Sequence, residues 1–131
     1  MIATTVSFNK KSSLIVIPVT IQTDAGILIY KFAVDTGASY TLIDTNSLAN
    51  IGYKISNSIR TIQTVTASKS ETAYEFKIKN IMALGLIRRN FKVISRSLPI
   101  GLGVDGLLGL NFFKNQELII DFKSSEIRLN F

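Results

Sequence analysis

The sequence contains no cysteine and no histidine. Without them the chain has no Cys–His or Ser–His nucleophile pair, no thiolate zinc site and no imidazole metal site. Carboxylates are then the main groups left for general acid–base chemistry, apart from lysine and tyrosine. The absence of cysteine also excludes a disulfide framework and is compatible with a reducing compartment. We therefore expect no metal and no cofactor, and we look for a site among the aspartates and glutamates.

Long apolar runs are missing too, since no stretch approaches the roughly 20 residues of a membrane span. The segment Met1–Thr5 lacks the basic and apolar regions of a secretory signal. We expect a cytoplasmic protein, or the soluble domain of a longer anchored protein, with no membrane contact in this segment. Its 131 residues suit one domain that covers residues 1–131.

Acidic residues are fewer than basic ones, and the formal net charge is +6. Such a balance can indicate a nucleic-acid partner. However, the basic residues between Lys54 and Arg96 mostly alternate with apolar ones, as solvent-facing strand residues do. No basic run is interleaved with aromatic residues, so we expect no nucleic-acid partner.

Short β-prone segments separated by turn signals dominate the chain. The expected strands include Leu14–Ile21, Ile27–Val34, Thr41–Ile43, Ile62–Thr66, Tyr74–Lys79, Ile81–Ile87, Phe91–Ile94, Val104–Leu110, Leu118–Phe122 and Ile127–Phe131, with a weak strand pattern at Thr4–Phe8. A turn is expected at Arg88–Asn90, between two of these strands. Short helices are expected at Asp44–Gly52, where Asp44 is the cap, and at Asn111–Asn115. This pattern predicts an all-β, closed and mostly antiparallel fold.

The segment Phe32–Ile43 places an aspartate on a tight glycine turn between two apolar runs. Gly37 lets the backbone turn beside the Asp35 carboxylate without a Cβ clash. A carboxylate in this setting is either a cap or a group whose ionisation the fold controls. The surrounding pattern favours the second interpretation, and Asp35 is our candidate catalytic residue.

Asp35-Thr36-Gly37-Ala38-Ser39 resembles the active-site loop of the retropepsin-like aspartic proteases, in their single-domain, retroviral-protease-like form. The segment Asp105–Leu110 resembles the second landmark of that family, two apolar residues and a glycine near the C-terminus. The resemblance runs from about Leu14 to Phe131. It implies a closed retropepsin-like barrel with a flap hairpin and one or two short helices.

The resemblance also implies a homodimer, because short family members pair one such loop from each of two chains across a two-fold axis. Asp35 of each protomer would supply the acid–base pair, Thr36 would lock the two loops together, and Gly37 would offer its carbonyl to the substrate. Ala38 matches the retroviral form and predicts activity at less acidic pH than the pepsin-like form. Ser39 stands where the retroviral form usually has a second aspartate that binds the substrate main chain, so weaker binding of the substrate is expected there.

Two further groups of residues take roles from the resemblance. Leu107, Leu108 and Gly109 would pack beneath the Asp35 loop and support it. The segment Ile59–Lys79 would be the flap that closes over substrate, or else an ordinary exposed hairpin. Its tip is expected at Ala67, Ser68, Lys69 and Ser70.

The other aspartates and aromatics receive structural interpretations. Asp105 is expected in a turn, although an intrachain pair with Asp35 would remove the need for a dimer. Asp121 is expected to be a strand or turn carboxylate. Three aromatic residues are expected to fill the core or an interface: Tyr40, Phe112 and Phe113.

Two functions from different classes remain open. The first is an aspartic endopeptidase that cleaves extended peptides or proteins as a homodimer. The alternative is a catalytically silent dimerisation or peptide-binding module with the same fold, because a fold does not fix a function. The intact Asp35-Thr36-Gly37 favours the enzyme.

Overall fold

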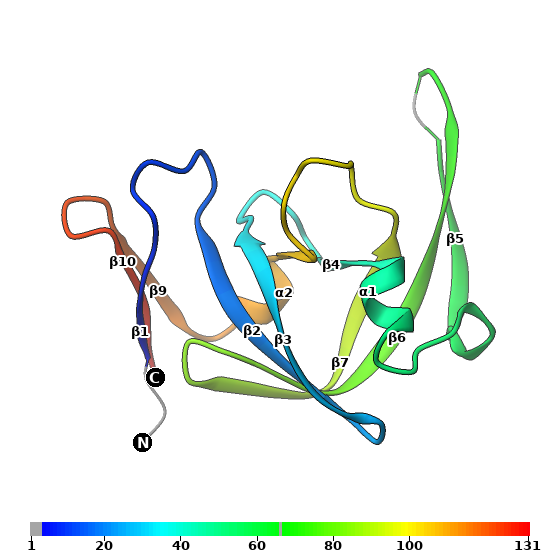
Figure 1. Cartoon of the computed structure of the whole chain (residues 1–131), viewed down its shortest axis with the longest axis horizontal. Coiled ribbons are helices and arrows are strands. Elements are labelled where there is room, and N and C mark those ends of the chain that lie inside the picture. Colours follow the sequence, from blue (N-terminus) through cyan, green and yellow to red (C-terminus); the bar gives the residue numbers. More distant parts are fainter. Residues whose placement is uncertain (1–3, 66) are drawn as a thin grey trace.

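The computed structural model describes residues 4–65 and 67–131. Met1–Ala3 and Thr66, the last residue of one expected strand, lie outside the described residues. Within the described part the chain forms strands joined by short turns and a few single-turn helices (Figure 1). The elements are β1 (Thr5–Ser7), β2 (Val16–Thr23), β3 (Gly26–Val34), β4 (Thr41–Asp44), α1 (Thr45–Ala49), η1 (Ile55–Asn57), β5 (Arg60–Val65), β6 (Ser70–Ala83), β7 (Leu86–Arg96), β8 (Gly106–Leu108), α2 (Leu110–Phe113), β9 (Glu117–Asp121) and β10 (Glu126–Asn130).

The larger sheet closes into a barrel, which confirms the expected fold. Its strand order is β2-β3-β8-β4-β7-β6-β5, and β2 also pairs with β6, so that six strands form a ring while β5 stands outside it. The ring closes where Thr20, Ile21 and Gln22 pair with Met82, Ile81 and Asn80. Closure leaves β5 as the free edge strand of this sheet.

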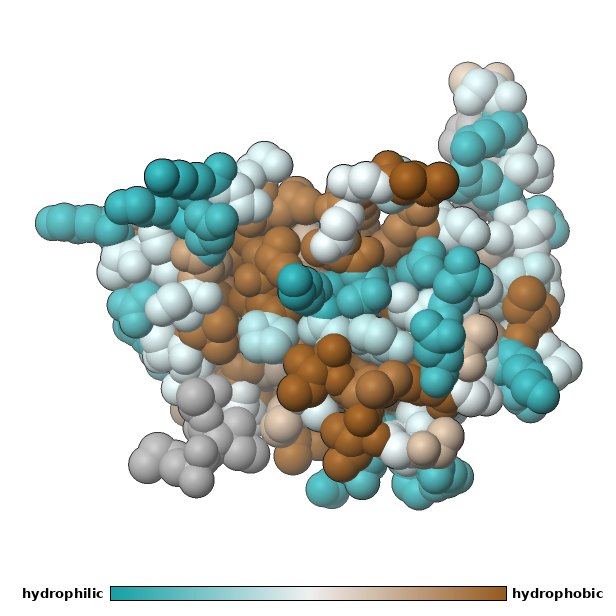
Figure 2. All heavy atoms as spheres, in the orientation of Figure 1, coloured by the Kyte–Doolittle hydropathy of each residue, from teal (hydrophilic) through white to brown (hydrophobic). Residues whose placement is uncertain are grey.

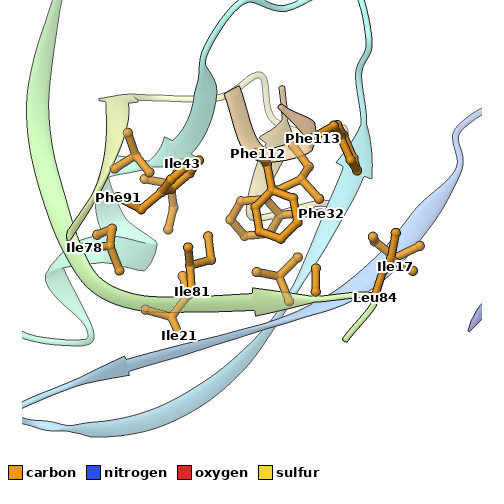
Figure 3. Packing of buried hydrophobic residues seen from close by; sticks show 14 of the residues in the cluster. Ile17, Ile21, Phe32, Ile43, Ile78, Ile81, Leu84, Phe91, Phe112 and Phe113 are labelled. Atoms are coloured by element: carbon orange, nitrogen blue, oxygen red, sulfur yellow. The ribbon is translucent and has the colours of Figure 1, made fainter. Parts of the chain in front are cut away.

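The barrel encloses the main hydrophobic core, and Figure 3 shows side chains from several strands and from α2 meeting there. Phe32 and Phe112 are fully buried, and Phe91 packs edge-on against Phe112 with ring centroids 5.8 Å apart. Phe113 is also buried, as expected. Tyr40 is 48% exposed, so of its two expected places, the core or an interface, the structure excludes the core. These aromatic rings hold α2 under the barrel strands, because edge-to-face packing adds to the burial of apolar area.

The two ends of the chain form a separate three-stranded sheet of order β1-β10-β9. Thr5 pairs with Arg128 and Ser7 with Glu126, all within one chain. The rings of Phe8 and Phe122 meet edge to face at 6.2 Å, although Phe122 remains 73% exposed. The weak strand pattern near the N-terminus therefore marks a real strand, whose partner is the last strand of the same protomer.

One expected turn is wrong in position. β6 and β7 are joined at Leu84–Gly85, four residues before the expected turn at Arg88–Asn90. Both Leu84 (φ 52°) and Gly85 (φ 80°) have positive φ, as a tight two-residue hairpin turn requires. Because the neighbours of Gly85 are apolar, no polar turn signal marks this position in the sequence. The polar segment Arg88–Asn90 belongs to the continuous strand β7.

The turn between β9 and β10 provides a prediction about acid stability. The Asp121 side chain accepts hydrogen bonds from the backbone N–H groups of Ser124 (3.1 Å) and Lys123 (2.9 Å). These bonds, first the one from Ser124, lower the pKa of Asp121 below its usual 3.8. A group with a lowered pKa stabilises the fold at pH values above its unfolded-state pKa. That stabilisation is lost as the pH falls through its folded-state pKa.

We therefore expect the melting temperature of the wild type to drop more steeply between about pH 5 and about pH 2 than that of Asp121→Asn, whose amide oxygen does not titrate. Thermal denaturation followed by circular dichroism across this range measures the difference. Parallel curves for the two proteins would show that the Asp121 charge contributes nothing.

No helix in the described part of the chain has the length and apolar character needed to cross a membrane.

Candidate active site

Asp35 follows β3 directly and sits on a loop at one edge of the barrel. Its backbone N–H donates to the Leu108 carbonyl (3.0 Å), which fixes the start of the loop to β8. Its side-chain Oδ1 accepts the N–H of Gly37 (3.0 Å), and its own carbonyl accepts the N–H of Ala38 (3.2 Å). The carboxylate is thus oriented by its own loop while staying half-buried and open to an incoming molecule.

The rest of this loop is largely accessible. Thr36, Gly37 and Ser39 are exposed, and Ala38 is half-buried. In Figure 1 the loop lies along the same upper edge as the segment 97–105 and the free end of the β5–β6 hairpin. The loop is therefore accessible to a molecule that approaches this edge of the barrel.

β8 runs beneath the loop, between the strand that enters it and the strand that leaves it. It pairs in parallel with β3, where Val34 is opposite Leu108, and antiparallel with β4, where Leu42 is opposite Leu107. Leu108 is fully buried. These strand pairs place the apolar residues of β8 next to both ends of the loop, and their role as its support stays a prediction.

Gly109 lies directly against the loop backbone. A Cβ at this position would collide with the carbonyl oxygen of Tyr40 and would lie 2.9 Å from the carbonyl oxygen of Ala38. The next two N–H groups, of Leu110 and Asn111, donate to the carbonyls of Ala38 (2.8 Å) and Ser39 (3.2 Å). The close approach that glycine permits lets the start of α2 bind the loop through its backbone.

A hydrogen-bonded pair, Thr41 and Asn111, completes the support, and the sequence reasoning missed it. The Asn111 Oδ1 accepts both the N–H and the hydroxyl of Thr41 (2.8 Å each), and its Nδ2 donates to the Lys92 carbonyl (3.0 Å). The Thr41 hydroxyl oxygen in turn accepts the Gly109 N–H (3.1 Å). Thr41 is fully buried and Asn111 is half-buried, and together they connect the loop exit, α2 and β7.

We expect Asn111→Ala to lower the free energy of unfolding by about 2 kcal/mol, because it leaves buried groups of Thr41 without a partner. Urea denaturation measures the change. The matched control is Asn130→Ala, which removes the exposed hydrogen bond from Asn130 to Glu117 and should cost less than about 0.5 kcal/mol. Equal costs for the two variants would contradict the role given to Asn111.

Asp105 does not lie near Asp35. Its carboxylate accepts the N–H of Lys31 (3.1 Å) and the hydroxyl of Ser47 (3.0 Å), so it links β3 to α1 just before β8 begins. Lys31 precedes Asp35 by four residues of extended chain, or roughly 13 Å. This position argues against an intrachain pair of Asp35 and Asp105. Asp105 lies at a bend before β8, and its carboxylate also links β3 to α1.

Burial and the Asp105 charge both raise the pKa of Tyr30, whose hydroxyl donates to the Ser47 carbonyl (2.7 Å).

Asp44 caps α1 as expected, since its side chain accepts the Asn46 N–H (3.2 Å). It also accepts the Leu98 N–H (3.0 Å). In residues 4–65 and 67–131 no three carboxylates gather as a metal site would require. The other aspartates near the barrel thus have structural partners.

The hairpin of β5 and β6 projects away from the barrel (Figure 1). Its strands pair from Arg60 opposite Glu75 to Val65 opposite Ser70. Ala67, Ser68 and Lys69 lie in the connection between the strands, and Ser70 is the first residue of β6. Figure 2 shows that the outer part of this hairpin carries mainly polar side chains.

Comparisons with known proteins agree with this architecture. The family model described as gag-polyprotein putative aspartyl protease matches residues 19–115. The fold is similar to a retropepsin-like aspartic protease from Rickettsia conorii, with TM-score 0.74, 21% identity and coverage of 97% of this chain and 89% of that chain. It is also similar to the retroviral protease-like domain of Ddi1 from Leishmania major, with TM-score 0.54, 17% identity and coverage of 92% and 97%. A search of curated proteins finds no match.

Proposed function

Because this chain belongs to the family of gag-polyprotein putative aspartyl proteases, we propose that it is an aspartic endopeptidase active as a homodimer. The observation that carries the proposal is the Asp35 loop, a half-buried carboxylate oriented by Gly37 and open at the barrel edge. Peptide hydrolysis by carboxylates needs two of them, and the chain has one such loop. The second carboxylate would come from another copy of the chain.

The exposed apolar residues of the same edge support a second copy as the partner. Ile100 in the segment 97–105 is fully exposed, and Leu110, whose N–H binds the Asp35 loop at Ala38, is 45% exposed. Exposed apolar side chains beside the loop would lose their contact with water in an interface. In the dimer the second copy would cover these apolar side chains, and the Asp35 residues of the two protomers would meet on the two-fold axis.

The two carboxylates would share one proton. The ionised one takes a proton from the attacking water, and the neutral one donates its proton to the oxygen of the scissile carbonyl. The Thr36 hydroxyl would hold the opposite loop, and the Gly37 carbonyl would accept a hydrogen bond from the substrate main chain. Ala38 and Ser39 would line the floor on which the substrate lies.

The substrate would be an extended peptide or a flexible protein segment. A peptide in this conformation binds by adding a strand, with its main chain bonded on both sides and its alternate side chains in pockets. The β5–β6 hairpin would act as the flap, with Ala67–Ser70 at its tip, and would close over the peptide. Exclusion of water under the hairpin would strengthen every polar contact at the carboxylates.

Two measurements on the same preparation test the proposal. Sedimentation equilibrium should show a concentration-dependent dimer, and a fluorogenic peptide with apolar side chains should be cleaved between about pH 3 and about pH 7 with a rate that follows the dimer fraction. A protein that stays monomeric yet cleaves the peptide would refute the shared dyad.

The alternative is a silent dimerisation or peptide-binding module of the same fold. The separation of the two Asp35 carboxylates in a dimer distinguishes it from the enzyme. Carboxylates close enough to share a proton support the protease, and carboxylates held well apart support the module. A crystal structure of the dimer measures this separation directly.

A further inference from the structure

A cavity of about 410 Å³ opens between the Asp35 loop and the base of the β5–β6 hairpin. It is lined by Tyr40, Leu42, Arg60, Ile62, Ala73, Glu75, Ile94 and Arg96. One row of paired residues crosses four strands beneath it: Leu42 is opposite Ile94, Ile94 opposite Glu75, and Glu75 opposite Arg60. The cavity thus starts at an apolar wall beside the Asp35 loop and ends at charged side chains under the hairpin.

The charges at that end are unequal. Arg60 and Arg96 line that end of the cavity with a single carboxylate, Glu75. Glu75 contacts Arg60 (3.1 Å) and Lys92 (3.8 Å), and the next carboxylate lies just outside the lining. Glu71 contacts Lys69 (2.7 Å) and Arg96 (3.2 Å). Asp44 is opposite Arg96 in the sheet and is the remaining acid beside this group. Four cations against these three acids leave one positive charge in excess.

Arg96 also has an unused donor. Its Nη1 binds Glu71, but its Nε is shielded from solvent and has no hydrogen-bond partner among the described residues. Because Nε is covered by protein atoms, the part of Arg96 that a ligand in the cavity can meet is the rest of its charged guanidinium group. Glu75, by contrast, is only 4% exposed and already bonded to Arg60, so its own charge is offset.

We propose that this cavity is a substrate subsite that takes a glutamate side chain. The methylene groups of glutamate would pack on Leu42, Ile62 and Ile94, and its carboxylate would meet the arginine end of the cavity. A lysine would be repelled by the same charges, and a leucine would leave them without a counter-charge. The proposal rests on the peptide binding that the proposed function includes, because the subsite has its meaning only on a bound peptide, whether or not that peptide is then cleaved.

The test compares peptides that differ at one position, scanned along a substrate that the wild-type dimer cleaves. At one position we expect kcat/KM to be about tenfold higher for glutamate than for glutamine, and higher still relative to lysine. In Arg96→Gln the preference for glutamate should fall to about twofold or less. Arg96→Lys keeps the charge but replaces the planar guanidinium by a compact ammonium group, and it should retain an intermediate preference.

Arg96 is chosen because Glu71 keeps Lys69 as a partner when the arginine is replaced, whereas removing Arg60 would leave the buried Glu75 with Lys92 alone. The charge control is Lys123→Gln, in the exposed turn of the terminal sheet, which should leave the glutamate preference unchanged. Circular dichroism and sedimentation verify that each variant folds and dimerises.

Binding to Asp35→Asn separates this proposal from the proposed function. Peptide affinity measured by fluorescence anisotropy should show the same glutamate preference without cleavage. If the wild type cleaves nothing but binding still prefers glutamate, the protease function fails and the subsite stands. If peptides are cleaved or bound equally well with glutamate, glutamine and lysine at every position, or if Arg96→Gln slows all of them alike, the subsite is refuted.

Discussion

Asp35→Asn is expected to reduce peptide cleavage by at least about 10²–10⁴-fold, because an amide neither takes a proton from water nor shares one with its copy. The fold should be unchanged, since the asparagine Oδ1 can still accept the Gly37 N–H that orients the aspartate. The measurement is kcat/KM on a fluorogenic peptide, together with sedimentation of the variant. Activity that survives in a purified Asp35→Asn dimer would refute the catalytic role.

Mixing the two proteins tests whether the site is shared. When equal amounts of wild type and Asp35→Asn exchange subunits at random, the activity should fall to about half of that of the wild type alone, because mixed dimers have one carboxylate. The control is the same amount of an unrelated protein, which should leave the activity unchanged. Activity that stays constant after complete exchange would mean that each protomer works alone.

Gly109→Ala should have the largest effect on stability, with an expected loss of about 3 kcal/mol in the free energy of unfolding. Gly109 has an ordinary φ of −94°, so the backbone conformation itself does not demand glycine. The added methyl group would instead lie 2.6 Å from the Tyr40 carbonyl carbon and 2.9 Å from the Ala38 oxygen. Because both neighbours are backbone atoms of the Asp35 loop, relief of the clash must move the loop. Urea denaturation and the peptide assay should therefore both report a loss.

Gly103→Ala is the matched control. Gly103 has a φ of +75°, where a side chain is strained, but a Cβ there would meet no atom within 4 Å. Its expected cost is about 1 kcal/mol, from backbone conformation alone. If Gly109→Ala lowers the free energy of unfolding no more than Gly103→Ala does, the close approach of α2 to the loop does not require glycine at position 109.

The sequence predicted the features that depend on local pattern. Alternating and β-branched segments identified most of the strands, and Asp44 was identified as a cap from its position before a short apolar pattern. The Asp35 loop was identified because a glycine turn between two apolar runs is a local signal. The barrel itself was inferred through the resemblance of that loop and of Leu107–Gly109 to a family, and the strand order confirms it.

What sequence reasoning missed depends on contacts between distant residues. Thr41 and Asn111 are separated by 70 positions, and nothing near either residue indicates that a threonine hydroxyl and an asparagine amide will meet. An Asn placed next to two phenylalanines was interpreted as part of a helical turn. Leu84 was missed for a different reason, since leucine rarely adopts a positive φ and gave no turn signal of its own.

The terminal sheet has a consequence for assembly. Since β1 pairs with the last strand of the same chain, the formation of this sheet does not need a second copy. After dilution from denaturant, recovery of the circular dichroism signal should then proceed at a rate independent of protein concentration. Enzymatic turnover should reappear later, with a lag that shortens as the concentration is raised, because association is a bimolecular step.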